Sequence, residues 1–219
     1  MYQAVIFDMD GVIIDSEIVY YNWLKELLAE KGAMIPEREL KKIVGLSNSQ
    51  SLRMMMEWFG REKGRKLWET YCEEEEGYDL SYKEIVNPGV KELLKLLREH
   101  HVKLALASSS AMEEILEILD ETGLKDYFPV ILSGEMFQES KPNPEIYIET
   151  MKQLDVTPGK CIVIEDSDYG IYAAKSAGAY VIAHEENRFG FKQQLADHIA
   201  HDMYHVKDII RTKFNLKSR

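Results

Sequence analysis

Apolar residues recur along this chain in short continuous runs that alternate with stretches of helical spacing. The continuous runs predict buried strands, and the first of them is Val5-Ile6-Phe7. Further strands are expected at residues 102–107, 129–132, 161–164 and 180–183. Helices are expected between them, at residues 90–97, 112–119, 144–154 and 169–176. Continuous apolar strands separated by helices predict an α/β fold in which helices cover both faces of a parallel sheet.

The segment from residue 16 to residue 82 has a different pattern. Apolar spacing predicts one helix through residues 21–28 that Gly32 ends, a second through residues 52–59, and a third that contains Leu67 and Tyr71. No strand-like alternation separates them. We therefore predict a helical cap domain at residues 16–82, inserted after the first strand of a core made of residues 1–15 and 83–219. Such an insert can close over a site and exclude water.

Composition narrows the class of protein. The chain has 219 residues, 45% of them hydrophobic and 30% charged, as in soluble globular proteins. A formal net charge of -11 argues against nucleic acid or an anionic membrane as the partner, since both attract positive patches. Two cysteines form no disulfide framework, no apolar run is long enough to cross a membrane, and the first strand leaves no room for a signal peptide. We expect a cytoplasmic protein, with a monomer as the default.

Two aspartates directly follow the first apolar run, in Asp8-Met9-Asp10-Gly11. On an extended backbone their carboxylates project to the same side, and Gly11 permits a sharp turn beneath them. Crowding two like charges costs free energy unless a divalent cation binds both. A calcium loop also begins with this spacing but needs glycine at its sixth position and glutamate at its twelfth, where this chain has Ile13 and Val19.

Polar groups follow other predicted strands. Glu165 and Asp166 end the run at 161–164, and together with Asp8 and Asp10 they would complete an oxygen cage for Mg²⁺; a helix N-cap at Asp166 or Ser167 is the competing interpretation. Ligands bind beyond the carboxyl ends of strands in parallel sheets.

Serine and lysine residues are candidates to bind phosphate at this edge of the sheet. Ser108 opens a run of three serines that either binds phosphate at a helix start or simply caps that helix. Lys141, in a loop stiffened by Pro142 and Pro144, is placed to neutralise a phosphoryl oxygen.

These four elements, in this order, resemble the motifs of the haloacid dehalogenase superfamily of phosphohydrolases. The matching segments are Phe7-Asp8-Met9-Asp10-Gly11-Val12, Ala107-Ser108-Ser109, Ser140-Lys141-Pro142 and Glu165-Asp166-Ser167. Asp15-Ser16-Glu17 and the helical insert resemble the branch that contains β-phosphoglucomutase and small sugar-phosphate phosphatases. The resemblance implies a Rossmann-like core, a helical cap, dependence on Mg²⁺ and an aspartyl-phosphate intermediate.

The resemblance also implies residue roles. Asp8 would attack phosphorus, and Asp10 would act as general acid and base. Mg²⁺ would be held by the Asp8 side chain, the Asp10 carbonyl and Asp166, with Glu165 as a further candidate ligand or as a residue that orients the metal site. The phosphate-binding candidates are Ser108, Ser109 and Lys141.

The substrate is expected to be a small phosphorylated metabolite, and the insert decides between phosphatase and mutase. The mutases carry a histidine and an arginine in the cap where this chain has Tyr20 and Asn48, and a lysine after the second motif where it has Ala111. These losses favour a phosphatase, although Arg53 could replace the missing arginine and keep a mutase possible. The cap residues expected at the substrate are Tyr20, Trp23, Leu46 and Asn48. Less favoured are a dehalogenase, which lacks the second aspartate, and a non-catalytic binding protein on the same fold.

The C-terminal segment carries His198, His201 and His205, which could share one face of a helix and suggest zinc. The segment is polar and has no nearby cysteine, so solvated histidines are the favoured interpretation.

Overall fold

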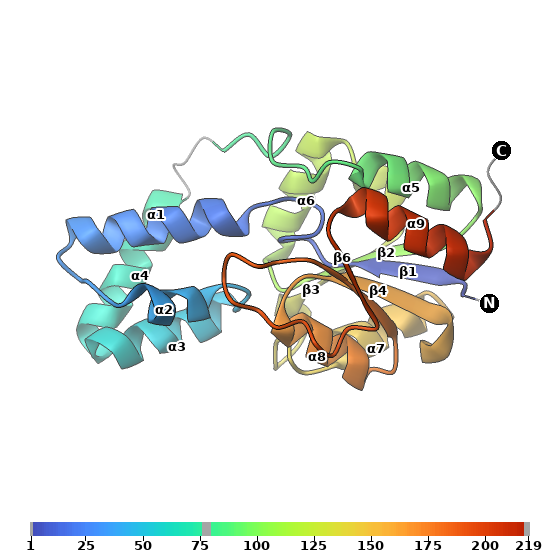
Figure 1. The fold of residues 1–219 in the computed structure, drawn as a ribbon. Helices are drawn as coiled ribbons and strands as arrows, with labels where there is room; N and C mark the ends of the chain where they lie inside the picture. Colours follow the sequence, from blue (N-terminus) through green and yellow to red (C-terminus); the bar gives the residue numbers. More distant parts are fainter. Residues whose placement is uncertain (1, 76–79, 217–219) are drawn as a thin grey trace.

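The computed structural model describes residues 2–75 and 80–216 (Figure 1). The strands are β1 Ala4–Phe7, β2 Lys103–Ser108, β3 Val130–Ser133, β4 Cys161–Glu165, β5 Tyr180–His184 and β6 His198–Ala200. The helices of the first part are α1 Glu17–Glu30, α2 Glu37–Leu40, α3 Asn48–Phe59 and α4 Arg61–Glu75. The later helices are α5 Val90–Glu99, α6 Met112–Thr122, α7 Glu145–Gln153, α8 Asp168–Ser176 and α9 Met203–Phe214. Short 3-10 helices are η1 Lys41–Ile43, η2 Lys125–Tyr127, η3 Gly134–Met136 and η4 Pro158–Lys160.

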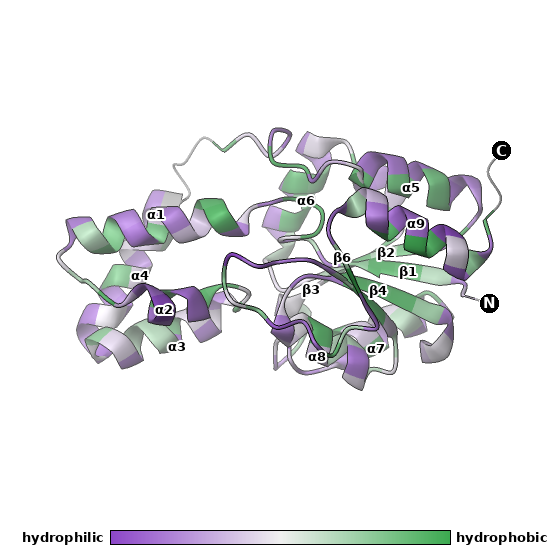
Figure 2. Ribbon diagram, viewed as in Figure 1, coloured by the Kyte–Doolittle hydropathy of each residue, from purple (hydrophilic) through white to green (hydrophobic). Residues whose placement is uncertain are grey.

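The strands form one parallel sheet in the order β3-β2-β1-β4-β5-β6. Strand residues alternate between its faces, as the pleat requires: Val5 and Phe7 belong to the core cluster under α5 and α9, and Ala4 and Ile6 to the one under α7 and α8. Figure 1 shows these two helix layers on opposite sides of the sheet, and Figure 2 shows the hydrophobic strands between them. The predicted fold class is confirmed.

Helices α1–α4 form a separate group beyond the carboxyl ends of the strands (Figure 1). They have a hydrophobic core of their own, which includes Leu24, Leu28, Met55 and Trp68. The loop after β5 also contributes: Phe189 is buried in this core, with its ring centroid 5.4 Å from that of Tyr21. Residues 76–79 of the predicted insert lie outside the described residues. Among the described helices, none combines the length and the apolar character that crossing a membrane requires.

The loop after β1 makes the turn that Gly11 was predicted to allow. Gly11 has φ +75°, a conformation that favours glycine, and its carbonyl accepts hydrogen bonds from Asn87 Nδ2 at 3.2 Å and His184 Nδ1 at 2.7 Å. Asn87 Nδ2 also donates to the Val12 carbonyl at 2.9 Å. Side chains distant in sequence therefore brace the segment that carries Asp8 and Asp10.

Two alternatives that the sequence left open are not realised. The serines after β2 do not cap α6: its N-cap is Ala111, which makes no side-chain cap hydrogen bond, and the Met112 N–H donates to Glu135 instead. The C-terminal histidines do not share a helix, because His198 lies in β6 and His205 in α9.

Candidate active site

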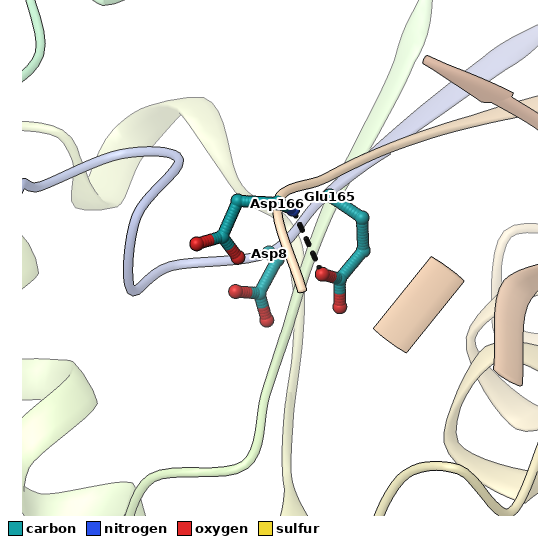
Figure 3. A group of neighbouring side chains, drawn as sticks. All are labelled: Asp8, Glu165 and Asp166. Carbon is teal, nitrogen blue, oxygen red and sulfur yellow. Dashed lines mark hydrogen bonds between the residues drawn. The ribbon is translucent and has the colours of Figure 1, made fainter. Parts of the chain in front are cut away.

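Three carboxylates converge where β1 and β4 end side by side. The Asp8 N–H donates to the Ile164 carbonyl at 3.0 Å, which places Asp8 beside Glu165. One carboxylate oxygen each of Asp8, Glu165 and Asp166 lies within 4.8 Å of the others, and all three residues are buried (Figure 3). Burial raises the pKa of Asp8, and the carboxylates of Glu165 and Asp10 add to this rise, while Lys141 lowers it.

Lys141 supplies the positive charge of this cluster. Its Nζ lies 2.5 Å from Asp8 Oδ1, 2.7 Å from Glu165 Oε1 and 3.1 Å from the Ala107 carbonyl. Burial lowers the pKa of Lys141, but Asp8 and Glu165 outweigh it, so the pKa stays well above its ordinary value. A protonated lysine buried against the Asp8 carboxylate is placed to neutralise charge on a group that Asp8 attacks.

Glu165 uses both carboxylate oxygens within the protein. Its Oε1 accepts from Lys141 Nζ and from the Tyr147 hydroxyl at 2.7 Å each. Its Oε2 accepts from the backbone of Asp166 at 2.9 Å and from the backbone and hydroxyl of Ser167 at 3.1 and 3.2 Å. Figure 3 shows the Glu165 and Asp166 carboxyl groups on opposite sides of the chain that follows β4. Glu165 therefore holds Lys141 and the loop after β4 in position.

Asp166 differs from Glu165, because one of its carboxylate oxygens accepts no hydrogen bond from the described residues. Ser167, not Asp166, is the N-cap of α8, and its Oγ accepts the Gly170 N–H at 3.0 Å. Asp166 Oδ2 is buried, and none of the described residues donates a hydrogen bond to it. Burial raises the pKa of Asp166 well above its ordinary value, and Glu165 and Asp8 raise it further. A buried carboxylate oxygen without a donor, beside a second carboxylate, fits a cation such as Mg²⁺.

Gly11 is required for this approach, because a Cβ on it would overlap the Asp166 carboxylate. The first and fourth motifs therefore meet at a position where only glycine leaves room.

Asp10 is held by two hydroxyl groups. Ser16 Oγ donates to Asp10 Oδ1 at 2.5 Å, and Ser110 Oγ donates to Oδ2 at 2.9 Å. Ser16 directly precedes α1, and Ser110 follows β2. A hydroxyl can donate or accept, so both serines can hold the Asp10 carboxyl with or without a proton.

A cavity of about 550 Å³ is lined by residues from this edge of the sheet and from helices α1, α3 and α4. The sequence-predicted residues that line it are Asp8, Asp10, Tyr20, Leu46, Asn48, Ser109, Lys141, Glu165 and Asp166. Ser108 is fully buried, and its Oγ accepts the Ser110 N–H at 3.0 Å. Trp23 is outside the cavity wall and packs against Tyr71, with ring centroids 4.9 Å apart. Arg53 is exposed and lines a separate cavity beside Gln138.

Sequence reasoning missed several residues that position the site. Ser16 and Ser110 hold Asp10, Tyr147 donates to Glu165, and Gln193 Nε2 donates to the backbone carbonyls of Asp166 and, at 2.7 Å, of His184. The sequence offered a clue to the role of Ser16 and Ser110, since each lies beside a recognised motif. Tyr147 and Gln193 had none in the sequence, because only the fold brings them to the carboxyl ends of the strands.

Comparisons with known proteins agree with the geometry. The family description "haloacid dehalogenase-like hydrolase" matches residues 5–184. Over 188 residues the chain is 36% identical to the phosphorylated carbohydrates phosphatase of Thermotoga maritima, covering 84% of this chain and 87% of that one. It is 31% identical to hexitol phosphatase B of Escherichia coli (strain K12) over 80% of this chain and 79% of that one.

A solved structure shows the same fold over the whole length. The β-phosphoglucomutase of Clostridium difficile superposes with a TM-score of 0.79 at 26% identity, covering 98% of each chain. The family suggested by the four motifs is thus confirmed by sequence and by fold. This chain belongs to the haloacid dehalogenase-like hydrolases.

Proposed function

We propose that this protein is a Mg²⁺-dependent phosphatase that hydrolyses a small phosphomonoester, of the sugar-phosphate class, through an aspartyl-phosphate intermediate. The observation that carries the proposal is the meeting of Asp8, Asp10, Asp166 and Lys141 at one end of the cavity. Relatives named as phosphatases of phosphorylated carbohydrates and hexitols support this substrate class.

In the first step an Asp8 oxygen attacks phosphorus and the ester P–O bond breaks. Lys141, which lies 2.5 Å from Asp8 Oδ1, neutralises charge on the phosphoryl oxygens. Asp10 gives its proton to the departing alcohol oxygen. In the second step water attacks the phosphorus, Asp10 takes a proton from that water, and the bond to Asp8 breaks. Ser16 and Ser110 keep Asp10 oriented through both steps.

The metal would be held by the Asp8 carboxylate, the Asp10 backbone carbonyl and Asp166, whose buried Oδ2 has no donor among the described residues. When bound, Mg²⁺ supplies positive charge to the phosphoryl oxygens. Glu165, with both oxygens used by protein donors, orients Lys141 and the loop that carries Asp166. Ser109 lines the cavity and serves the phosphate, with Ser108 shaping its turn.

Residues 16–82 act in this proposal as a cap domain over a core of residues 1–15 and 83–219. Its contribution to the cavity wall includes Tyr20, Leu46 and Asn48, which would contact the leaving group. The chain has only two cysteines, Cys72 and Cys161, which is the basis for expecting the cytoplasm as the compartment. A monomer suffices for this chemistry, because every proposed group comes from one chain.

A phosphomutase of the β-phosphoglucomutase type is the second candidate, because relatives of this type share the fold. A mutase must hold a bisphosphate, yet among the described residues of the cavity wall Lys141 is the only basic one. Arg53 lines a different cavity. The charge of the wall therefore favours the phosphatase.

A phosphate-release screen over many phosphomonoesters, with Mg²⁺ and with a chelator, tests the proposal. We expect release that needs Mg²⁺ and that Asp8→Asn abolishes without loss of fold. Release that chelation leaves unchanged would contradict the metal assignment. Conversion of a hexose 1-phosphate to its isomer without free phosphate would favour the mutase.

A further inference from the structure

We propose that the cavity wall selects its substrate by charge: the alcohol released by the phosphatase carries no second phosphate or carboxylate group, and a polyol that carries an amine is accepted. This inference rests on the proposed phosphatase function and specifies the leaving group. It is based on the charge of the cavity wall that lies across from the reacting groups.

Helix α6 presents three carboxylates to the cavity. Glu114, Glu117 and Glu121 are three and four positions apart, which places them along one face of the helix, and all three line the cavity. Glu114 Oε1 accepts the Tyr20 hydroxyl at 3.4 Å, and Glu121 Oε1 accepts the Lys83 N–H at 3.2 Å. Within residues 2–75 and 80–216, no lysine, arginine or histidine side chain forms an ion pair with Glu117 or Glu121.

Helix α1 adds a carboxyl group on the cap side, close to Asp8 and Asp10. Glu17 lines the same cavity, where its Oε1 accepts the Gly45 N–H at 3.1 Å. Burial and the neighbouring Asp10 and Asp8 carboxylates raise the pKa of Glu17 to about 8, so the negative charge of the wall beyond the reacting groups comes from α6.

Neither Lys141 nor Arg188 is available for a second anion. Lys141 is held by Asp8 and Glu165 and can serve only the phosphoryl group that reacts. Arg188 forms ion pairs with Asp15 and Glu186 and does not line the cavity. A phosphate or carboxylate at the far end of a substrate would thus face carboxylates, with no cation from the described part of the wall to offset its charge.

The remainder of the wall suits an uncharged polyol. The wall also includes the aromatic residues Tyr20, Trp68 and Tyr71, which can contact C–H groups, and Asn48 and Ser51, which can form hydrogen bonds to hydroxyls. Carboxylates are also strong acceptors for hydroxyl and ammonium donors. A cavity of about 550 Å³ has the size of a site for a small molecule.

A matched series of 6-phosphates tests the inference: a hexose, its 2-amino derivative, its C1 carboxylate and its 1,6-bisphosphate. We expect kcat/KM for the amino sugar to equal or exceed that of the neutral hexose. The carboxylate and the bisphosphate should be poorer by about ten-fold or more, and this ratio should shrink as ionic strength rises, because salt screens the partly exposed wall.

Glutamate-to-glutamine variants remove the charge of a wall residue and keep the shape of its side chain. Glu117→Gln and Glu121→Gln should each raise kcat/KM for the bisphosphate relative to the neutral hexose, about three- to ten-fold. Glu113→Gln removes an exposed carboxylate of the same helix that does not line the cavity, and it should leave the ratio unchanged. A change of the ratio cannot come from a general loss of fold, which would lower both rates.

The outcomes distinguish this inference from the proposed function. A bisphosphate or carboxylate turned over as well as the neutral hexose, or a strongly rejected amino sugar, overturns the charge selection while the phosphatase stands. Equal ratios in the Glu117, Glu121 and Glu113 variants overturn the role of α6. Absence of phosphate release from every substrate overturns the proposed function and this inference with it.

Discussion

Replacing Gly170 by alanine tests the position of the Glu165 carboxylate. The substitution normally stabilises a helix, and here we expect it to destabilise the protein. Gly170 lies in α8, where a Cβ would overlap the Glu165 carboxylate. In a helix, alanine is normally about 1 kcal/mol more favourable than glycine. Here the carboxylate would have to move away from the donors that hold it, Lys141 and Tyr147 among them.

The expected magnitude follows from those hydrogen bonds. Hydrogen bonds to charged groups contribute about 1.5–3 kcal/mol each, so loss of two costs roughly 3–6 kcal/mol. After the gain in helix propensity, we expect Gly170→Ala to lower the free energy of unfolding by about 2–5 kcal/mol. Turnover should fall on the order of a hundred-fold, because Lys141 and Asp166 lose their support.

Urea denaturation and the rate of phosphate release measure the two effects. Gly159→Ala is the matched control, since a Cβ there has no atom within 4 Å, and its free energy of unfolding should change by less than about 0.5 kcal/mol. A Gly170→Ala protein as stable and as active as the wild type would show that the Glu165 carboxylate does not occupy the space beside α8.

Three further predictions concern other parts of the site. Ser16→Ala combined with Ser110→Ala should lower kcat about ten- to hundred-fold with little change in KM, because Asp10 loses both donors that orient it; an unchanged kcat in steady-state assays would refute this. Mg²⁺ should raise the melting temperature of the wild type and not that of Asp166→Ala, as differential scanning fluorimetry would show; an equal rise in both would remove Asp166 from the metal site. Phe189→Ala should lower the free energy of unfolding by about 3–5 kcal/mol in urea denaturation, because the ring is buried among the cap helices, and a change below about 1 kcal/mol would contradict that packing.

The elements that place Asp8 and Asp166 were predictable from the sequence. Both residues follow buried apolar runs, and the carboxyl ends of neighbouring parallel strands meet at one edge of the sheet. Gly11 was predictable for the same reason, as a turn directly after the first strand. The sequence could not show that Gly11 must also leave room for the Asp166 carboxylate, because that approach depends on how β1 and β4 pair.

The side chains that donate hydrogen bonds to Asp10 and Glu165 come from distant positions in the sequence, so the sequence pattern could not identify them. Ser110 is 100 positions from Asp10, and Tyr147 is 18 positions from Glu165. A serine after a strand also fits helix capping, which the sequence pattern left open beside phosphate binding. The structure shows Ala111 at that cap, because Ser110 turns its hydroxyl to Asp10 instead.

Of the two edge strands of the sheet, β3 was predicted from the sequence and β6 was not. Strand β6 has three residues, two of them exposed, so its apolar run is too short to predict a strand. It was recognisable only by its pairing with β5, Ile182 with His198 and His184 with Ala200. An edge strand buries little surface and leaves a weak apolar signal.

Phosphorylation of Asp8 is the central claim, and mass spectrometry of the enzyme quenched in acid during turnover tests it most directly. We predict that the peptide containing Asp8 gains the mass of one phosphoryl group, and that this gain is absent in Asp8→Asn and without substrate. Turnover at full rate with no phosphorylated peptide, or with the phosphoryl group on another residue, would contradict the account.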